Sequence, residues 1–147
     1  QVLIEVLNAA MNIELDILNQ IAHAEGTATE RLIRAVSTFV RRAMNSPRLS
    51  YSLLFEPVDP KFELERFQSK QLIKESISKI LTEGKANGEF DFEDLNTTAL
   101  CIAGTMTFVV IEPISLSKSK SFDKSYKEYF VKQISDFCLN AVHKAKP

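Results

Sequence analysis

An uncharged run from Leu95 to Ile111 places the strongest constraint on how this chain can fold. The run lies between Asp94 and Glu112, and after Ala99 it has almost no polar face. A helix that is apolar all round has to be covered on every side. One side can pack on the chain's own core. We therefore expect the other side to pack against a second copy of the same chain.

The composition of this run argues against a membrane-spanning helix. A bilayer-crossing helix needs about 20 mainly apolar residues. The run is slightly shorter than that, and it contains Asn96 together with threonines at positions 97, 98, 105 and 107. Burial in protein is the better interpretation, so we expect no membrane partner.

The overall composition is that of one globular domain over residues 1–147, with 45% hydrophobic and 25% charged residues. A net charge of -1 gives no global field that favours nucleic acid. The charges are nevertheless uneven. The first 25 residues carry acids but no lysine or arginine, whereas residues 31–48 carry arginines but no acid. We interpret the two stretches as solvated helix faces that attract each other.

Apolar residues recur at helical spacing, and no sustained strand-like alternation is present. This pattern predicts an all-α array of six helices without an internal repeat or domain boundary. The expected helices run from about Val2 to Ala24, from 28 to Asn45, from Pro47 to Phe55, from Pro60 to Lys85, from 91 to just before Pro113, and from Phe122 to Lys144.

Capping residues support these boundaries. We expect N-terminal caps at Thr27 (in a capping box with Glu30), Ser46, Asp59 and Asp91. We expect glycines to end helices at Gly26 and Gly88. The polar stretch 115–121 is predicted to be a loop.

No metal or cofactor site is predicted. Cys101 and Cys138 are too far apart in sequence for a zinc motif, and two cysteines make no disulfide framework. We expect both thiols to be reduced and buried. His23 and His143 lie near predicted helix ends, where terminal carbonyls are more plausible partners than a metal.

No arrangement of residues in the sequence predicts an enzyme. A Ser-His-Asp or Cys-His pattern, a glycine-rich phosphate loop and a Glu-x-x-His pair are all absent. The nearby carboxylates of Glu63 and Glu65 are two residues apart, so they point to different helix faces. We therefore assign no catalytic residue.

Four segments, taken in order, resemble the C-terminal domain of the TetR family of transcriptional regulators. They are ERL at 30–32, NSPRL at 45–49, SLLFEPVDP at 52–60 and EGKANGEF at 83–90. The resemblance covers essentially the whole chain, and EGKANGEF is its strongest piece. It implies the all-α fold of that domain and a role in regulating transcription in the bacterial cytoplasm.

The resemblance also implies partners. In the family, a helix-turn-helix domain precedes this region and binds DNA. The C-terminal domain binds a small ligand, which changes the spacing of the DNA-binding heads. Because the chain begins at Gln1 inside a helical pattern, we expect it to be a fragment that contacts DNA only through a missing N-terminal domain.

Family members form homodimers through their last two long helices, which pair into a four-helix bundle. The corresponding helices here supply the predicted dimer interface. Its residues are Leu100, Ala103, Gly104, Thr107, Phe108, Ile111, Tyr126, Tyr129, Phe130, Gln133, Ile134 and Phe137. The alternative is that both helices pack only within one chain.

The helices that surround the central cavity in the family supply the predicted ligand contacts. These residues are Met11, Leu15, Phe39, Met44, Leu54, Phe55, Phe67, Ile77, Thr105 and Met106. Apolar walls with a few hydroxyls suit a small, mostly apolar ligand, although each residue could equally be ordinary core. Arg66 and Lys70 could bind an anion, or they could belong to a solvated helix face.

Two function hypotheses follow. The first is a regulatory domain that binds a small ligand and homodimerises. The second is a helical protein-interaction and dimerisation module without a small ligand. The size of the internal cavity separates them, because an interaction module would fill that space with its own side chains.

Overall fold

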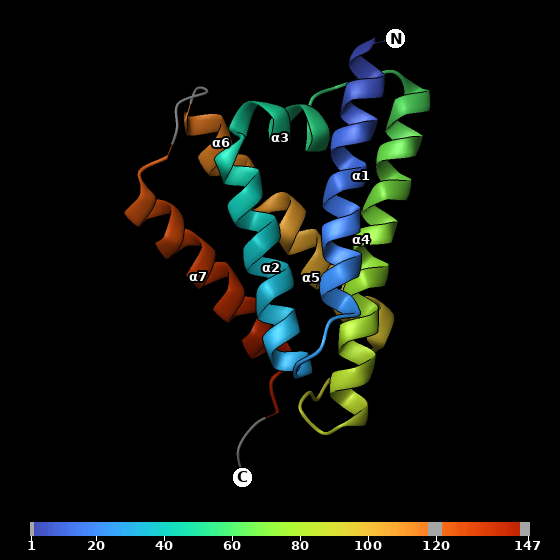
Figure 1. The fold of residues 1–147 in the computed structure, drawn as a ribbon, viewed down its shortest axis with the longest axis vertical. Helices are drawn as coiled ribbons and strands as arrows, with labels where there is room; N and C mark the ends of the chain where they lie inside the picture. Colours follow the sequence, from blue (N-terminus) through green and yellow to red (C-terminus); the bar gives the residue numbers. More distant parts are fainter. Residues whose placement is uncertain (1, 118–121, 145–147) are drawn as a thin grey trace.

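The computed structural model describes residues 2–117 and 122–144, and its helices are labelled in Figure 1. They are α1 (Val2–Ala22), α2 (Ala28–Asn45), α3 (Pro47–Leu54), α4 (Pro60–Ala86), α5 (Leu95–Phe108), α6 (Ile111–Ser117) and α7 (Lys124–Val142). Extended pairing within these ranges is limited to an isolated bridge between Phe90 and His143. The all-α prediction is confirmed.

The stretch expected as a single uncharged helix forms two segments, α5 and α6. They are separated by a turn at Val109 and Val110. Pro113 lies in the first turn of α6, where a missing backbone N–H costs no helical hydrogen bond. The helix therefore continues through 115–117, which we had expected to lie in a loop; that expectation was wrong. The remainder of the expected loop, 118–121, lies outside the described residues.

Helix α2 is the centre of the array. It packs against α1, α3, α4, α5 and α7, as Figure 1 illustrates. Its inward residues follow the predicted spacing of three and four, and Leu32, Val36 and Val40 are fully enclosed. Every other long helix therefore contacts α2.

Two of the four predicted N-terminal caps are confirmed. The side chains of Thr27 and Asp59 each accept a hydrogen bond of 3.0 Å, from the amides of Glu30 and Phe62 respectively. Ser46 makes no such bond, although Pro47 does occupy the first turn of α3 as expected. The hydroxyl prediction at this position was wrong.

The cap of α5 is Asp94 rather than Asp91. The Asp94 carboxylate accepts a hydrogen bond of 2.7 Å from the amide of Thr97. Asp91 lies four residues before Leu95, the first residue of α5, and its amide donates to the carbonyl of Val142 at the end of α7 over 2.8 Å. The misplaced cap has a tertiary cause, since Asp91 joins the α4–α5 turn to α7.

The backbone conformation and packing of the EGKANGEF segment require its two glycines, Gly84 and Gly88. Gly88 has φ +86°, a left-handed conformation that allows the chain to reverse after α4. Gly84 lies under the buried ring of Phe90, and a Cβ built on Gly84 would stand 2.1 Å from a ring carbon. The close approach of helix and ring requires glycine at position 84.

Glu89 connects the same turn to the start of α2. Its carboxylate accepts hydrogen bonds from the amides of Ala28 (3.1 Å) and Thr29 (2.8 Å) and from the side chain of Asn87 (2.6 Å). Partial burial raises the pKa of Glu89, but these hydrogen bonds outweigh it and the net pKa is lowered. A carboxylate at a helix N-terminus is also favoured by the helix dipole.

Arg31 joins three helices at one point. Its guanidinium is buried, and it donates to the carbonyl of Ala22 (2.7 Å) and to the carboxylate of Glu83. Glu83 also accepts from Lys79 at 3.2 Å. Hydrogen bonds from Arg31 and then Lys79 lower the pKa of Glu83. The end of α1, the start of α2 and the end of α4 are thereby held together.

This junction predicts acid sensitivity. The pKa of Glu83 lies below its ordinary value of 4.5, so the ionised form stabilises the fold at neutral pH, and this contribution is lost as the pH falls through the lowered pKa. We expect Glu83→Gln to reduce the free energy of unfolding by about 1 kcal/mol at pH 7, because the Glu83 side chain is 40% exposed. Near pH 3 the variant should differ little from the wild type.

Urea denaturation at pH 7 and pH 3 measures both values. Glu93→Gln, which changes an exposed carboxylate in the α4–α5 loop, is the matched control. An equal loss of stability for Glu83→Gln at both pH values would contradict the assigned role.

Candidate functional site

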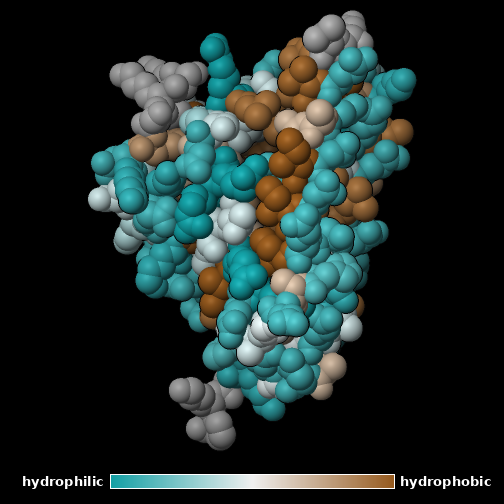
Figure 2. All heavy atoms as spheres, in the orientation of Figure 1, coloured by the Kyte–Doolittle hydropathy of each residue, from teal (hydrophilic) through white to brown (hydrophobic). Residues whose placement is uncertain are grey.

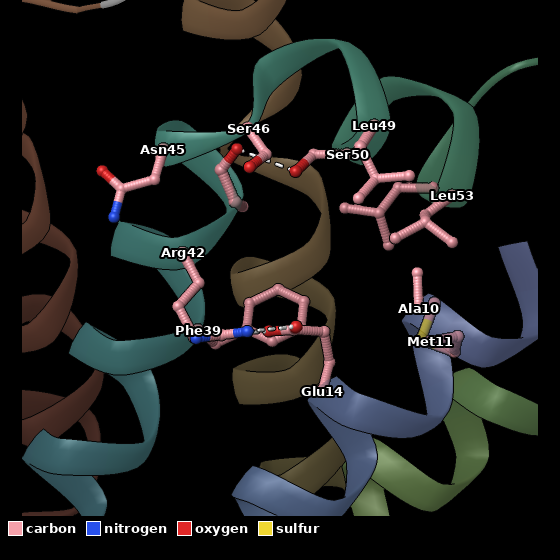
Figure 3. Close-up of a pocket in the computed structure, with 12 residues that line it drawn as sticks. Ala10, Met11, Glu14, Phe39, Arg42, Asn45, Ser46, Leu49, Ser50 and Leu53 are labelled. Atoms are coloured by element: carbon pink, nitrogen blue, oxygen red, sulfur yellow. Dashed lines mark hydrogen bonds and ion pairs between the residues drawn. The ribbon is translucent and has the colours of Figure 1, made fainter. Parts of the chain in front are cut away.

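A pocket lies between α1, α2 and α3 (Figure 3). Its volume is about 160 Å³. It is lined by Ala10, Met11, Glu14, Phe39, Arg42, Ala43, Asn45, Ser46, Leu49, Ser50, Leu53 and Leu54. Apolar side chains from all three helices form one part of the wall, and the polar groups are contributed by α1, by α2 and by the start of α3.

An ion pair links α1 and α2 at this pocket. The Nε and one terminal nitrogen of Arg42 donate to the two carboxylate oxygens of Glu14 at 2.8 and 2.9 Å. These hydrogen bonds, and the attraction of the carboxylate, raise the pKa of Arg42. The predicted attraction between the acidic first helix and the arginine-rich second helix is confirmed at this pair, whose hydrogen bonds are dashed in Figure 3.

Other polar groups at the pocket already have partners. The Ser50 hydroxyl donates to the carbonyl of Ala43 over 2.8 Å. Asn45 points away from the pocket in Figure 3, and its side-chain oxygen accepts from Lys127 of α7 at 2.7 Å. Charge at this site is therefore supplied by Glu14 and Arg42.

The predicted ligand contacts separate into several locations. Met11, Phe39 and Leu54 line the pocket. Met44, Ile77 and Met106 are enclosed in the core. Leu15, Phe55 and Thr105 are half-buried elsewhere, and Phe67 is 58% exposed on α4. Contact with a ligand stays a prediction for all ten residues.

Sequence reasoning missed the charged pair and part of the apolar wall. Glu14 and Arg42 carried a usable signal, because each lies on a helix whose charges oppose those of the other. Leu53 was missed because it is adjacent to Leu54 on a short helix whose orientation the sequence does not fix. Ser50 had no sequence signal.

Arg66 does not act as a free anion-binding group. It is buried, and its guanidinium donates to the carbonyls of Ser52 (3.2 Å) and Glu56 (2.7 Å) and to the carboxylate of Glu63 (3.0 Å). Arg66 thus connects the end of α3 to α4. Burial, followed by the charge of Arg66, lowers the pKa of Lys70.

A second candidate site is an apolar surface on the adjacent helices α5 and α7. Large side chains along it are exposed, including Phe108 (69%), Tyr129 (64%) and Phe137 (64%). We call this the α5–α7 surface. Its further exposed members are Leu100, Gly104, Tyr126 and Gln133.

The remaining predicted interface residues are less accessible. Ile111, Phe130 and Ile134 are half-buried. Ala103 and Thr107 are buried within their own chain, and the Thr107 hydroxyl donates to the carbonyl of Ala103 over 3.0 Å. Of the residues predicted on α5, those facing outward are Leu100, Gly104 and Phe108.

By length and composition alone, the stretch Leu95–Leu116 could cross a membrane. Within this chain 44% of its most apolar window is buried. It also packs on α4 and α7 as part of the helical array. Some apolar side chains of this stretch are therefore buried in the chain's own core, and the exposed ones on α5 belong to the α5–α7 surface.

The expectation of two buried thiols was half wrong. Cys138 is buried, and burial raises the pKa of its thiol to about 11. Cys101 is exposed and lies between Leu100 and Gly104 on α5. No group of three metal-binding side chains exists in the described ranges. His23 Nδ1 donates to the carbonyl of Asn19 over 2.8 Å, as expected near a helix end.

A third apolar surface follows α1 and α4. Figure 2 shows a hydrophobic stripe along α1, where Leu3, Val6 and Ile13 are more than half exposed. On α4, Leu64 and Phe67 are each 58% exposed. No predicted interface residue lies on this surface.

Comparisons with known proteins give matches at the level of structure. No family model and no curated protein matches the chain. A transcriptional regulator of the TetR/AcrR family from Thermobifida fusca YX-ER1 superposes with a TM-score of 0.70 at 19% identity, covering 95% of this chain and 72% of the regulator. A bacterial regulatory protein of the TetR family from Rhodococcus RHA1 gives 0.65 at 17% identity, covering 97% and 75%.

These superpositions agree with the resemblance carried by the four sequence segments. At such low identity they establish the arrangement of helices. The chain therefore has the fold of TetR-family transcriptional regulators.

Proposed function

We propose that this chain is the regulatory region of a cytoplasmic, TetR-like transcriptional regulator. In this proposal it binds a small, mostly apolar ligand and homodimerises. DNA is contacted through a separate N-terminal domain, and the chain catalyses no reaction. The observation that carries the proposal is a pocket between α1, α2 and α3 in a chain with the TetR fold.

The α5–α7 surface supports the homodimer. Large apolar side chains gathered on one face of a protein commonly mark an interaction site. Phe108, Tyr129 and Phe137 are each more than 60% exposed in a single chain. A second copy would bury them by pairing α5 and α7 with their symmetry mates in a four-helix bundle.

Helix α1 supports a mechanism of regulation. It contributes Met11 and Glu14 to the pocket, and its 21 residues reach about 32 Å at 1.5 Å per residue. A ligand that prefers one position of α1 would shift the population toward that position. The shift is limited by the difference in the ligand's affinity for the two positions.

Helix α2 supports communication between the pocket and the dimer surface. Arg42 contacts Glu14 of α1, while the adjacent Arg41 donates to both carboxylate oxygens of Glu128 of α7 at 2.9 Å. A displacement of α2 at the pocket would therefore also displace α7 through the Arg41–Glu128 ion pair.

The volume of the pocket bears on the ligand. Typical small-molecule sites have volumes of about 300–1,000 Å³, whereas this one has about 160 Å³. We propose that a compact ligand binds there and that the pocket widens when α1 moves. The competing hypothesis, an interaction module without a ligand, predicts that the chain's own side chains fill this space and that no small molecule binds.

Native mass spectrometry of the purified full-length protein tests the proposal. We expect a dimer that carries a small molecule. Leu54→Trp, which fills the pocket wall, should lose the small molecule and keep the dimer. A monomer would contradict the homodimer. A dimer whose spectrum is the same with and without added apolar compounds would favour the interaction module.

A further inference from the structure

We infer that the pocket between α1, α2 and α3 selects an amphipathic cation, an apolar molecule with a protonated amine or amidine, and that this cation replaces Arg42 at the Glu14 carboxylate. The inference rests on the proposed function, because it assigns a ligand class to the same pocket. It also assigns a regulatory consequence to binding, which is the release of an ion pair between α1 and α2.

Glu14 and Arg42 are buried to different extents. The Glu14 side chain is 20% exposed and that of Arg42 is 43% exposed. Arginine has a long, flexible side chain that can turn its charged end to water. The shorter Glu14 side chain is half-buried against the apolar wall and cannot do so, and a partly desolvated charge without a partner is unfavourable. Separating the pair therefore leaves Glu14 in need of a new cation.

The apolar wall lies directly beside this carboxylate. Ala10 and Met11 lie four and three residues before Glu14, so both neighbour it on the surface of α1, and all three line the pocket. Phe39 lies one turn before Arg42 on α2, and both side chains line the pocket (Figure 3). A ligand bound at Glu14 would thus place its apolar part against Met11 and Phe39.

The other ligand charges fit less well. Glu14 and Arg42 are the charged residues among those that line the pocket. An anion would take Arg42 and leave the more buried Glu14 unpaired. A neutral molecule would gain the apolar contacts but would have no means to separate the pair. Only a cationic ligand satisfies both groups, because it pairs with Glu14 while Arg42 turns its charged end to water.

The consequence for α1 follows from the ion pairs of the array. Glu14–Arg42 is the ion pair that joins α1 to α2 in the described part of the chain. When the ligand holds Glu14, α1 is no longer connected to α2 by a charge. The pocket-lining part of α1 can then shift relative to α2 so that the pocket widens around the ligand, while Arg31 still donates to the carbonyl of Ala22 at the end of α1.

The test uses three probes with one apolar body: hexylamine, 1-hexanol and hexanoate. Methyl resonances of the full chain, labelled at its methionines, report the site. Met11 lines the pocket, and Met106 is enclosed in the core away from it. We expect hexylamine to shift the Met11 methyl with at least about tenfold higher affinity than 1-hexanol, and the Met106 methyl to stay in place.

Variants of the pair give effects of opposite sign. Glu14→Gln should reduce hexylamine affinity to that of 1-hexanol. Arg42→Gln should raise it several-fold, because the competing guanidinium is gone. Arg41→Gln is the matched control, since Arg41 is adjacent to Arg42 but pairs with Glu128 outside the pocket. Circular dichroism and Tm establish that each variant is folded.

Three results would overturn the inference. They are tighter binding of hexanoate than hexylamine, weaker hexylamine binding in Arg42→Gln, or no shift of Met11 with any probe. A neutral molecule found on the dimer by native mass spectrometry would reject the cationic ligand while leaving the proposed function in place.

Discussion

Replacing Phe137 with lysine is expected to turn a dimer of this chain into a monomer. Phe137 lies on α7 and is 64% exposed in a single copy. In a symmetric dimer the substitution is present twice. Removal of a central aromatic contact costs about 2 kcal/mol or more, so two copies cost about 4 kcal/mol. This loss corresponds to roughly a 1,000-fold increase in the dimer Kd.

Phe67→Lys provides the matched control for this experiment. Phe67 is 58% exposed, and it lies on α4, outside the α5–α7 surface. Sedimentation across a dilution series should give equal dimer Kd values for the control and the wild type. A Phe137→Lys protein that dimerises as tightly as the wild type would place the interface elsewhere.

The rate of thiol alkylation at Cys101 shows whether the dimer interface covers α5. Cys101 is exposed in one copy and lies on α5, between two residues of the predicted interface. We expect a thiol reagent to modify Cys101 slowly in the wild-type dimer and rapidly in Phe137→Lys. Cys138 is buried with a raised thiol pKa, so it should stay unmodified in both and serve as an internal reference.

Gly84→Ala is expected to have the largest effect on stability. The new Cβ would stand 2.1 Å from the ring of Phe90, which is itself buried. Overpacking of this kind costs about 1–3 kcal/mol. Alanine recovers up to about 1 kcal/mol through its higher helix propensity. We expect a net loss of about 1–2 kcal/mol, measured by urea denaturation.

A double-mutant cycle with Phe90→Leu assigns this loss to the ring. Phe90→Leu alone should destabilise the chain by leaving a cavity. In the double variant, the smaller side chain makes room for the Cβ, so the loss should be less than the sum of the two single losses. Strict additivity, or a neutral Gly84→Ala, would show that the close approach does not constrain position 84.

The helices were predictable because their signals are local. Caps at Thr27 and Asp59 and the reversal at Gly88 depend on a few neighbouring residues, and all three are confirmed. The errors have causes beyond the local sequence. Asp91 resembles a cap, but its amide bonds to α7. Pro113 resembles a stop, but a proline in the first turn of a helix is tolerated.

The site was less predictable, because periodicity identifies an apolar face without naming its neighbour. Met44 and Met106 have the same helical spacing as Met11, yet they face the core while Met11 faces the pocket. Ala103 and Thr107 likewise turn inward on α5, one position away from the outward Gly104 and Phe108. Only the packing of α5 on its neighbours decides between the two directions.

A second copy of the chain is expected to cover the α5–α7 surface, and sedimentation equilibrium of the wild-type chain tests this most directly. We predict a species of twice the 16.6 kDa chain mass at micromolar concentration. A species of 16.6 kDa that persists to high micromolar concentration would contradict the account, because Phe108, Tyr129 and Phe137 would then stand exposed to water without a partner.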